Sequence, residues 1–292
     1  MAKERTGYSL NQSPLYRLTK KKRLAELLGV TIKQLHAFTR TERLYKERES
    51  PKKKGGIRKI EDPRHDLKMV QRRIARLLAR IRPPEYLSCP VRGRSYVTNA
   101  SRHIGSRVIR TIDVKKYFPN TKCHRVFWFF RTVMECEPDV AEILAKIATY
   151  QGHLPTGSPL SPIMAFYAHC DVWEEVARLA NSIQAKSTLY IDDFTISGAQ
   201  VPGTAMWDIK KVVHRSGLRY HKEKSYCGHA AEVTGVIVNG GKLVPPNRQF
   251  LKRWRLDNAT RRVTNPREKD ALTAQLHGLS AQMAQIKAAN RS

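Results

Sequence analysis

The spacing of apolar residues predicts a chain of amphipathic helices alternating with short strands. Residues 66–82 carry the most regular helical pattern, with apolar side chains on one face and arginines on the other. The apolar face holds Leu67, Val70, Ile74, Leu77, Leu78 and Ile81, and the basic face holds Arg72, Arg73, Arg76 and Arg80. Pro83-Pro84 ends this helix. An arginine face of this kind could follow a phosphate backbone.

Other stretches follow helical or strand periodicity less regularly. Helices are predicted over residues 12–28, 31–39, 121–135, 138–150, 162–181 and 203–216, and strands over 107–114, 233–238 and 242–244. Residues 40–54 are charge-rich and are expected to be exposed, and His221 and Lys224 are expected to lie in a turn. Beyond Pro245-Pro246 the chain is predicted to be helical and basic.

One stretch, residues 188–197, places two adjacent aspartates between two β-prone runs. This pattern predicts a tight hairpin with Asp192 and Asp193 at its tip. Two carboxylates so close together are unfavourable unless a cation neutralises them, and Mg²⁺ prefers oxygen ligands. The alternative is that the pair forms an ordinary polar turn.

A third aspartate, Asp113, ends the strand predicted over residues 107–114. If that strand and the hairpin are neighbours in one sheet, Asp113 could converge with Asp192 and Asp193. Three carboxylates would hold two Mg²⁺ ions, which is the arrangement that promotes in-line phosphoryl transfer.

Two further segments could contact a nucleotide. Residues 52–60 predict a basic hairpin turned at Gly55-Gly56, and its Lys54 and Arg58 could grip a triphosphate, although a plain basic surface loop is the alternative. Residues 154–162 form a loop of Pro, Gly and Ser ahead of a helix, where small residues allow a ligand to approach the backbone closely.

The charge distribution points to a polyanionic partner. The formal net charge is +29 over 292 residues, of which +16 falls in residues 1–82 and +7 in residues 248–292. No signal peptide or membrane span is predicted. The five cysteines have no zinc-type spacing, so we expect reduced thiols and a cytoplasmic protein.

The order of these motifs resembles that of a reverse transcriptase over about residues 50–245. The motifs are the basic hairpin, Asp-x4-Phe, Pro-Thr-Gly-Ser-x2-Ser-Pro and Tyr-Ile-Asp-Asp. The resemblance implies an α+β right-hand polymerase with fingers, a sheet-based palm and a short helical thumb. It implies residues 1–50 as a basic helical extension, 51–105 as fingers, 106–244 as palm (with part of the fingers at about 120–155) and 245–292 as thumb.

The resemblance also assigns residue roles in an RNA-directed DNA polymerase, a magnesium-dependent nucleotidyltransferase. Asp113 and Asp192 would be the main metal ligands, with Asp193 as the second member of the aspartate pair. Phe118 would lie under the sugar and reject a 2′-hydroxyl. The other residues expected to bind dNTPs or template are Lys54, Arg58, Thr156, Gly157, Ser158 and Lys224.

Two short motifs resemble signatures of retron reverse transcriptases. Asn99 and His103 fit Asn-Ala-x-x-His, and Val233, Thr234 and Gly235 fit Val-Thr-Gly. Both are expected to recognise RNA, although Asn99 and His103 could instead be a structural polar pair that closes a loop. The resemblance implies a cognate structured noncoding RNA, priming from a 2′-hydroxyl of a guanosine in it, and a branched RNA–DNA product (msDNA). It further implies anti-phage defence with a separate effector protein, and trimming of the product by host ribonuclease H.

The sequence departs from the family at three of these places. Thr156 stands where Gln is usual, Ile191 where Ala is usual, and His221 where Asn is usual. The first change is expected to alter contacts to the nucleotide and template, and the second to be tolerated in packing. Two alternatives stay open: a diversity-generating or abortive-infection type of bacterial reverse transcriptase, and a non-catalytic RNA-binding scaffold.

Overall fold

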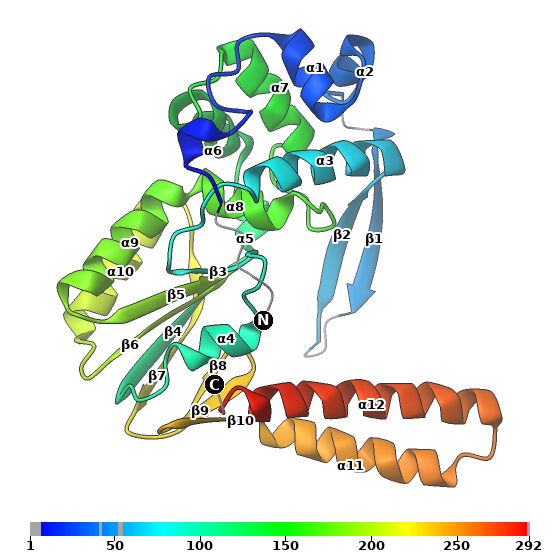
Figure 1. Cartoon of the computed structure of the whole chain (residues 1–292), viewed down its shortest axis with the longest axis vertical. Helices are drawn as coiled ribbons and strands as arrows, with labels where there is room; N and C mark the ends of the chain where they lie inside the picture. The colour runs from blue at the N-terminus through cyan, green and yellow to red at the C-terminus, as the bar shows by residue number, and fades with distance from the viewer. Residues whose placement is uncertain (1–6, 41–42, 52–54, 291–292) are drawn as a thin grey trace.

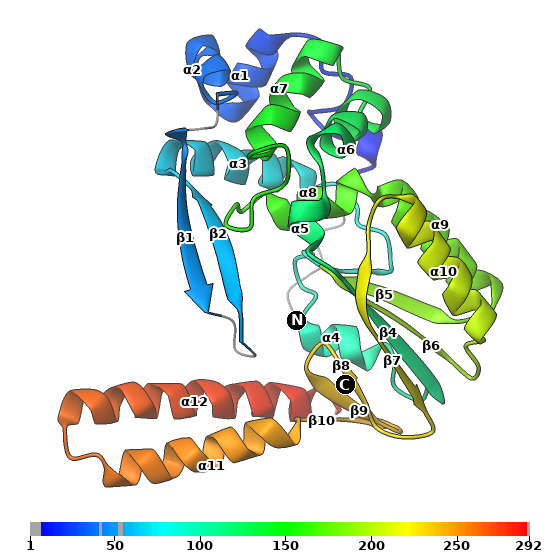
Figure 2. The ribbon, with the colours of Figure 1, turned by 180° about the vertical axis from the view of Figure 1, so that it is seen from behind.

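A five-stranded mixed sheet forms the centre of the molecule. The computed structural model describes residues 7–40, 43–51 and 55–290. The strand order is β3 (Leu87–Cys89), β5 (Lys186–Tyr190), β6 (Asp193–Gly198), β4 (Val108–Val114) and β7 (Tyr220–Cys227). The β3–β5 pair is parallel and the other pairs are antiparallel. Two helices, α9 (Cys170–Ser182) and α10 (Gly203–Arg215), lie side by side over one face of the sheet (Figures 1 and 2).

A helical region stands above the sheet in Figure 1. Its longer members are α1 (Lys21–Leu28), α2 (Ile32–Ala37), α3 (His65–Leu78), α6 (Cys123–Trp128), α7 (Pro138–Ala148) and α8 (Ser161–Ala168). The apolar stripe of α3 is buried as its periodicity predicts, together with one polar side chain, Gln71. Thr31 caps α2 by accepting a hydrogen bond from the backbone N–H of Gln34.

A two-stranded hairpin descends from α3 towards the lower part of the molecule (Figure 1). It consists of β1 (Tyr45–Pro51) and β2 (Ile57–Pro63), so it is longer than the predicted hairpin and includes much of the charged stretch 40–54. Gly55 and Gly56 take φ values of +85° and +87°, which side chains other than glycine rarely adopt.

Strand β4 separates two apolar cores. Ile112 and Val114 belong to the main core, whereas Ile109 packs in a smaller one. That smaller core joins α4 (Tyr96–Ser101) to a three-stranded sheet of β8 (Ala231–Val233), β9 (Val236–Asn239) and β10 (Lys242–Val244). The strand therefore links the helical region to the lower sheet.

A long helical hairpin, α11 (Asn247–Arg262) and α12 (Pro266–Ala288), projects below the rest (Figure 1). It is held at its base at two places. Arg248 of α11 makes hydrogen bonds of 2.9 and 2.6 Å to the carboxylate of Glu232. Asn290, just beyond α12, accepts from the backbone N–H of Leu243 and donates to its C=O. These contacts fix the hairpin to the three-stranded sheet.

Several predicted elements were wrong in extent. The helix predicted over 162–181 is broken at His169 into α8 and α9, and the segment of His221 and Lys224 is strand β7 rather than a turn. The strand predicted over 233–238 is interrupted by a turn at Thr234-Gly235, where both residues have positive φ. Residues 12–28 contain only η1 (Leu10–Gln12), which overlaps their start, and α1. In the described ranges, none of the helices has the length and hydrophobicity needed to cross a membrane.

Candidate active site

Three adjacent strands bring the predicted aspartate and lysine positions onto one face of the sheet. Asp113 of β4 lies directly opposite Asp193 of β6 on one side and opposite Lys222 of β7 on the other. Two residues along, Thr111 is paired in the same way with Thr195 and Lys224. Because side chains alternate between faces with a period of two, these six project to the same side. The predicted convergence of two segments that are distant in the sequence is therefore present for Asp113 and Asp193.

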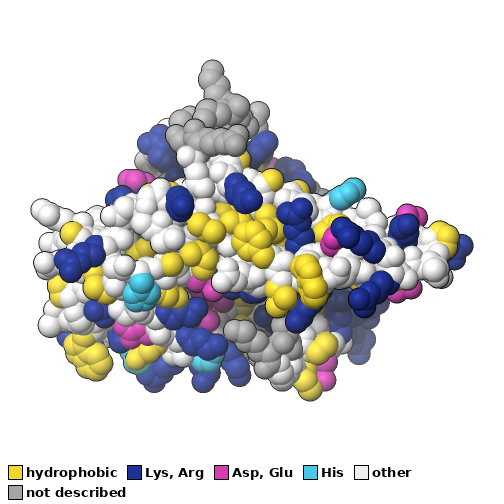
Figure 3. Space-filling model, turned by 90° about the horizontal axis from the view of Figure 1, so that it is seen from below, with side chains coloured by type: hydrophobic (Ala, Val, Ile, Leu, Met, Phe, Trp, Pro, Cys, Tyr) yellow, Lys and Arg dark blue, Asp and Glu magenta, His cyan; other side chains and the backbone are white. Residues whose placement is uncertain are grey.

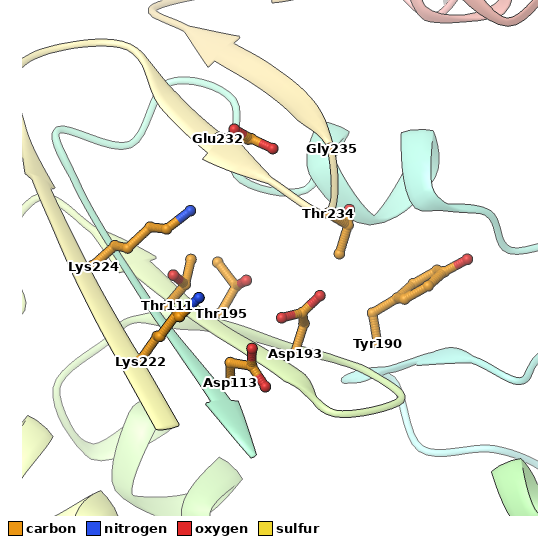
Figure 4. Close-up of a pocket in the computed structure, with 10 residues that line it drawn as sticks. All are labelled: Thr111, Asp113, Tyr190, Asp193, Thr195, Lys222, Lys224, Glu232, Thr234 and Gly235. Atoms are coloured by element: carbon orange, nitrogen blue, oxygen red, sulfur yellow. The ribbon is translucent and has the colours of Figure 1, made fainter. Parts of the chain in front are cut away.

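These side chains line a cavity of about 310 Å³. Figure 4 shows the carboxylates of Asp113 and Asp193 at its base, with the amino groups of Lys222 and Lys224 reaching in from β7. The remaining lining residues are Tyr190, Glu232, Thr234 and Gly235. A polar cavity with two carboxylates facing two lysines suits a ligand that carries both anionic groups and bound cations.

The turn that carries Asp192 is conformationally strained. Tyr190 pairs with Asp193, so Ile191 and Asp192 form the two-residue turn between β5 and β6. Ile191 has φ +58°, a value that is unusual for a β-branched residue. The backbone N–H of Val114 donates to the Asp192 C=O at 2.8 Å, which ties the turn to the end of β4. The residue at position 191 must therefore adopt this backbone conformation as well as fit the packing around it.

The carboxylates perturb one another. Burial, with the nearby charges of Asp192 and Asp113, raises the pKa of Asp193 to about 7, and Lys224 opposes this shift. Burial also raises the pKa of Asp192, and the charge of Arg58 acts in the opposite direction. Arg58 is exposed on β2, so the basic hairpin brings a positive charge near the aspartate turn. Burial is the largest cause of both shifts, and the neighbouring positive charges do not offset it.

Carboxylate oxygens are the donors that a hard divalent cation prefers. Asp113 and Asp193 face each other, and Asp192 is close enough to influence the pKa of Asp193. Within the part of the chain that the structure describes, no group of three or more His, Cys, Asp or Glu side chains is gathered closely enough to chelate an ion. The residues therefore fit a divalent cation in type and position, but the three carboxylates are not gathered as closely as the ligands of one bound ion.

Sequence reasoning missed Lys222. Lys224 was expected to face a nucleotide from a turn, and the structure places it on strand β7 beside Thr111. The strand period then brings Lys222 to the same face, directly opposite Asp113. His221 lies beside Asp113 as well, with 4.0 Å between Nδ1 and Oδ2. Alternation of Lys222 with Lys224 was the signal that could have identified the strand.

The Pro-Thr-Gly-Ser loop does not line the cavity but contacts the base of the β1–β2 hairpin. Thr156 donates from its hydroxyl to the Lys59 C=O at 2.9 Å and accepts from the Glu61 N–H at 3.2 Å. The Gly157 N–H donates to the Glu61 C=O at 3.1 Å. Ser158 is buried and bonded to Gln71 at 2.7 Å. The loop thus sets the position of the hairpin.

The remaining nucleotide-binding predictions fall in different places. Phe118 follows β4 in the short helix α5 (Tyr117–Asn120), is partly buried, and is stacked on Tyr117. Arg58 is exposed on β2, and its charge acts to lower the pKa of Asp192. Lys54 lies outside the described residues.

The two signature motifs contact each other inside the protein. Asn99 of α4 donates to the Thr234 hydroxyl at 3.3 Å, and that hydroxyl donates to the Tyr96 C=O at 3.0 Å. Asn99 is 1% exposed and Val233 is fully buried. Thr234 and Gly235 form the turn between β8 and β9 and reach the cavity wall.

His103 is fully buried as well, and its expected contact with RNA stays a prediction. Its Nδ1 lies 2.8 Å from Ser197 Oγ of β6 and its Nε2 lies 2.8 Å from Thr188 Oγ1 of β5. Asn99 and His103 therefore clamp α4 between the β8–β9 turn and the central sheet, which is the structural alternative for this pair. Only Thr234 and Gly235 of the two motifs reach the cavity.

Comparisons with known proteins agree on one family. The family model described as reverse transcriptase (RNA-dependent DNA polymerase) matches residues 50–240. The retron Se72 reverse transcriptase of Salmonella heidelberg is 25% identical over 248 residues, covering 78% of this chain and 65% of that protein. The retron Mx65 reverse transcriptase of Myxococcus xanthus is 31% identical over 217 residues, covering 65% of this chain and 50% of that protein. The matches thus span half to two thirds of these relatives.

A solved structure supports the fold. Telomerase from Candida albicans in complex with the TWJ fragment of telomeric RNA superimposes with a TM-score of 0.51 at 11% identity. The superposition covers 69% of this chain and 46% of that one. At this identity the likeness concerns the fold alone, and it confirms the predicted α+β right-hand polymerase architecture.

Proposed function

Because the chain belongs to the reverse transcriptase (RNA-dependent DNA polymerase) family and is of the retron type, we propose that it copies an RNA template into DNA in the cavity between β4, β6 and β7. The observation that carries this proposal is the direct pairing of Asp113 with Asp193 beside Lys222. Nucleotidyl transfer needs closely spaced carboxylates next to groups that bind phosphate, and this sheet presents both on one face.

Asp113, Asp192 and Asp193 are the residues that would hold the divalent cations, and we propose two Mg²⁺ ions. When bound, such ions lower the pKa of the attacking hydroxyl and stabilise the departing pyrophosphate. The raised pKa values of Asp192 and Asp193 support this assignment, because burial, the largest cause of both shifts, disfavours the ionised carboxylates and a bound cation would favour them.

The basic side chains around the cavity would bind the triphosphate. Lys222 and Lys224 reach in from β7, and Arg58 approaches the aspartate turn from β2. Arginine can hold phosphate oxygens with two parallel hydrogen bonds, whereas each lysine supplies a compact positive charge. Lys54 remains a prediction. Phe118 would lie under the deoxyribose and exclude a 2′-hydroxyl, and Thr156, Gly157 and Ser158 would act by holding the β1–β2 hairpin over the nucleotide.

The finer division of the molecule is part of the proposal. Residues 1–50 would be an extension and 51–105 the fingers, with a further part of the fingers at about 120–155. Residues 106–244 would be the palm and 245–292 the thumb. The helical hairpin α11–α12 supports the last assignment, since it projects beside the palm and is strongly basic.

The retron type suggests partners and a product. We propose that the substrate is a structured noncoding RNA, that synthesis is primed from a 2′-hydroxyl in it, and that the product is branched RNA–DNA. An effector protein, trimming by ribonuclease H and a role in defence against phage belong to the same proposal. Thr234 and Gly235 are the residues of the two signature motifs that could touch RNA, with Asn99, His103 and Val233 holding them in place.

Templated extension of a primed RNA tests the proposal. The wild-type chain should add dNTPs. Loss of an outer-shell group lowers the activity of a metal site roughly 10–100-fold, and Asp193→Asn, which removes a proposed metal ligand, should lower the extension rate by more than this. Asp208→Asn, which changes a half-buried carboxylate on α10, serves as a control and should extend normally. RNA affinity of Asp193→Asn should be equal or higher, because the substitution removes negative charge near a polyanion.

Two outcomes would reject the proposal. If the wild type is as inactive as Asp193→Asn while still binding RNA, the chain is an RNA-binding scaffold. If Asp193→Asn extends as well as Asp208→Asn, synthesis does not depend on this cavity.

A further inference from the structure

A chain of buried aromatic rings runs beneath the aspartate turn. Phe194, which follows Asp193 in β6, is stacked on Trp173 of α9 with ring centroids 6.0 Å apart. Trp173 meets the edge of Tyr117, and Tyr117 is stacked on its neighbour Phe118. Phe194, Trp173 and Tyr117 are each 3% exposed or less. The partly exposed ring of Phe118 is therefore connected through rigid, buried rings to the residue next to Asp193.

Hydrogen bonds fix the middle of this chain. The Trp173 Nε1–H donates to the Tyr117 hydroxyl at 2.9 Å, and that hydroxyl donates to the Ala165 C=O of α8 at 2.8 Å. A tyrosine whose oxygen both donates and accepts cannot rotate or slide without breaking a buried hydrogen bond. Burial, with a smaller contribution from the charge of Asp192, raises the pKa of Tyr117, so this hydroxyl stays protonated and keeps its donor.

The backbone before these rings is constrained as well. Lys116, the residue before α5, has φ +49°, a conformation that non-glycine residues rarely adopt. The strand β4 therefore turns sharply after Val114 and delivers Tyr117 into the core and Phe118 to its edge. The height of Phe118 relative to Asp113 depends on how firmly Tyr117 is held.

We propose that Tyr117 and Trp173 are positioning residues that hold Phe118 rigid and so determine how strictly the site excludes ribonucleotides. The inference rests on the proposed function, in which Phe118 lies under the sugar. Exclusion of one hydroxyl by a steric clash works only if the ring cannot move aside, since a shift of a fraction of an ångström would admit the extra oxygen. The Trp173–Tyr117 hydrogen bond supplies that rigidity by fixing the ring on which Phe118 is stacked.

Trp173→Phe tests the inference, with an aromatic ring retained at this buried position. It keeps an aromatic ring and removes only the Nε1–H donor and the second ring, while Tyr117 retains its bond to Ala165. The measurement is single-nucleotide insertion with dGTP and with GTP on the same primed RNA template. We expect discrimination, the ratio of the two kcat/KM values, to fall about tenfold, which corresponds to ~1.4 kcal/mol. The loss should come from faster GTP use with dGTP use nearly unchanged.

Tyr167→Phe is the matched control. It also removes a buried tyrosine hydroxyl, which donates to the Leu78 C=O at 3.3 Å, but this ring is not bonded to Tyr117 or Trp173. Its discrimination should equal that of the wild type even if its thermal midpoint falls. Tyr117→Phe is a second variant, expected to lower discrimination in the same direction as Trp173→Phe.

Phe118→Val separates failure of this inference from failure of the proposed function. If Phe118→Val admits GTP but Trp173→Phe and Tyr117→Phe discriminate like the wild type, the positioning role is overturned and the function stands. If Phe118→Val does not admit GTP, or if the wild type inserts neither nucleotide, the assignment of Phe118 fails and the inference fails with it. A drop in both kcat/KM values by the same factor would mean that Trp173 has only a structural role.

Discussion

Thr234 illustrates how a short motif acts through packing. Its φ of +46° is costly for a β-branched residue, and its hydroxyl offsets that cost by joining Asn99 to the Tyr96 C=O. Thr234→Val keeps the shape and removes both hydrogen bonds, so the free energy of unfolding should fall by about 1–3 kcal/mol in chemical denaturation. Thr234→Ser retains the hydroxyl and should keep most of the free energy of unfolding that Thr234→Val loses. A valine variant as stable as the wild type would contradict this role.

His103 predicts a loss of stability in acid. Burial, with the charges of Arg102 and Lys186, lowers the pKa of His103 to about 3, whereas an unfolded histidine titrates near ~6.5. Between these values the unfolded chain binds more protons than the folded one. The stability contribution is therefore complete above the unfolded pKa and is lost as pH falls, at up to ~1.4 kcal/mol per pH unit.

Denaturant unfolding over a series of pH values measures this effect. His103→Gln should reduce the acid-side slope by about one proton. Replacement of the exposed His36 on α2 by Gln is the control and should leave the slope unchanged. An unchanged slope in His103→Gln would show that His103 is not the group that resists protonation.

At the scale of single residues, the sequence predicted which residues carry the chemistry better than it predicted what surrounds them. The paired aspartates and Asp113 were identifiable because carboxylates next to strands of opposite direction have a chemical reason to converge. The burial of Asn99 and His103 was not identifiable, because the sequence is the same whether a polar side chain contacts RNA or packs in the core. Lys222 was missed once its segment was assigned to a turn.

At the scale of elements, the β1–β2 hairpin depends on a close approach of backbones. A Cβ added at Gly157 would lie 2.6 Å from the Glu61 C=O oxygen, so Gly157→Ala must push β2 away from the loop. Stability should fall by about 1–3 kcal/mol. The KM for dNTPs should rise about tenfold, because the hairpin carries Arg58.

Steady-state kinetics of Gly157→Ala and Gly241→Ala would test this. A Cβ at Gly241 meets nothing within 4 Å, and its φ lies outside the positive range, so this variant should behave like the wild type. If Gly157→Ala binds dNTPs normally, the hairpin does not take part in nucleotide binding.

The elements also show where periodicity stops being informative. The stripe of α3 was predicted almost residue by residue, because one face is buried and the other is solvated. The break at His169 was not predicted, because α8 is apolar on all sides and carries no proline or glycine at its end. Strand β7 was missed because most of its residues are exposed and its middle, Lys222 to Lys224, is charged, so it has no apolar alternation.

At the scale of the whole molecule, the charge of +29 should make RNA binding strongly dependent on salt. Figure 3 shows Lys and Arg side chains spread across the lower face, with hydrophobic side chains between them. Arg72 and Arg76 are exposed on the outer face of α3, and the described residues offer neither of them a salt bridge. Unneutralised arginines on one helix face suit a phosphate backbone.

Arg72→Gln/Arg76→Gln should therefore reduce the steepness of log Kd against log salt. If both side chains contact phosphates, the slope should change by about 1.4–1.8 units. Lys211→Gln/Arg215→Gln removes the same charge from α10, where Asp208 and Glu175 already pair with these residues, and should change the slope much less. Equal changes for both variants would mean that only net charge matters.

The nucleic acid bound to the chain in its native host tests the central claim most directly. The account predicts that the wild type is isolated with a species containing both RNA and DNA, joined by a linkage that a debranching enzyme cleaves. Asp193→Asn should be isolated with the RNA alone, in equal or greater yield. DNA bound equally to both proteins, or RNA without DNA on the wild type, would contradict the claim that this cavity copies a cognate RNA into DNA.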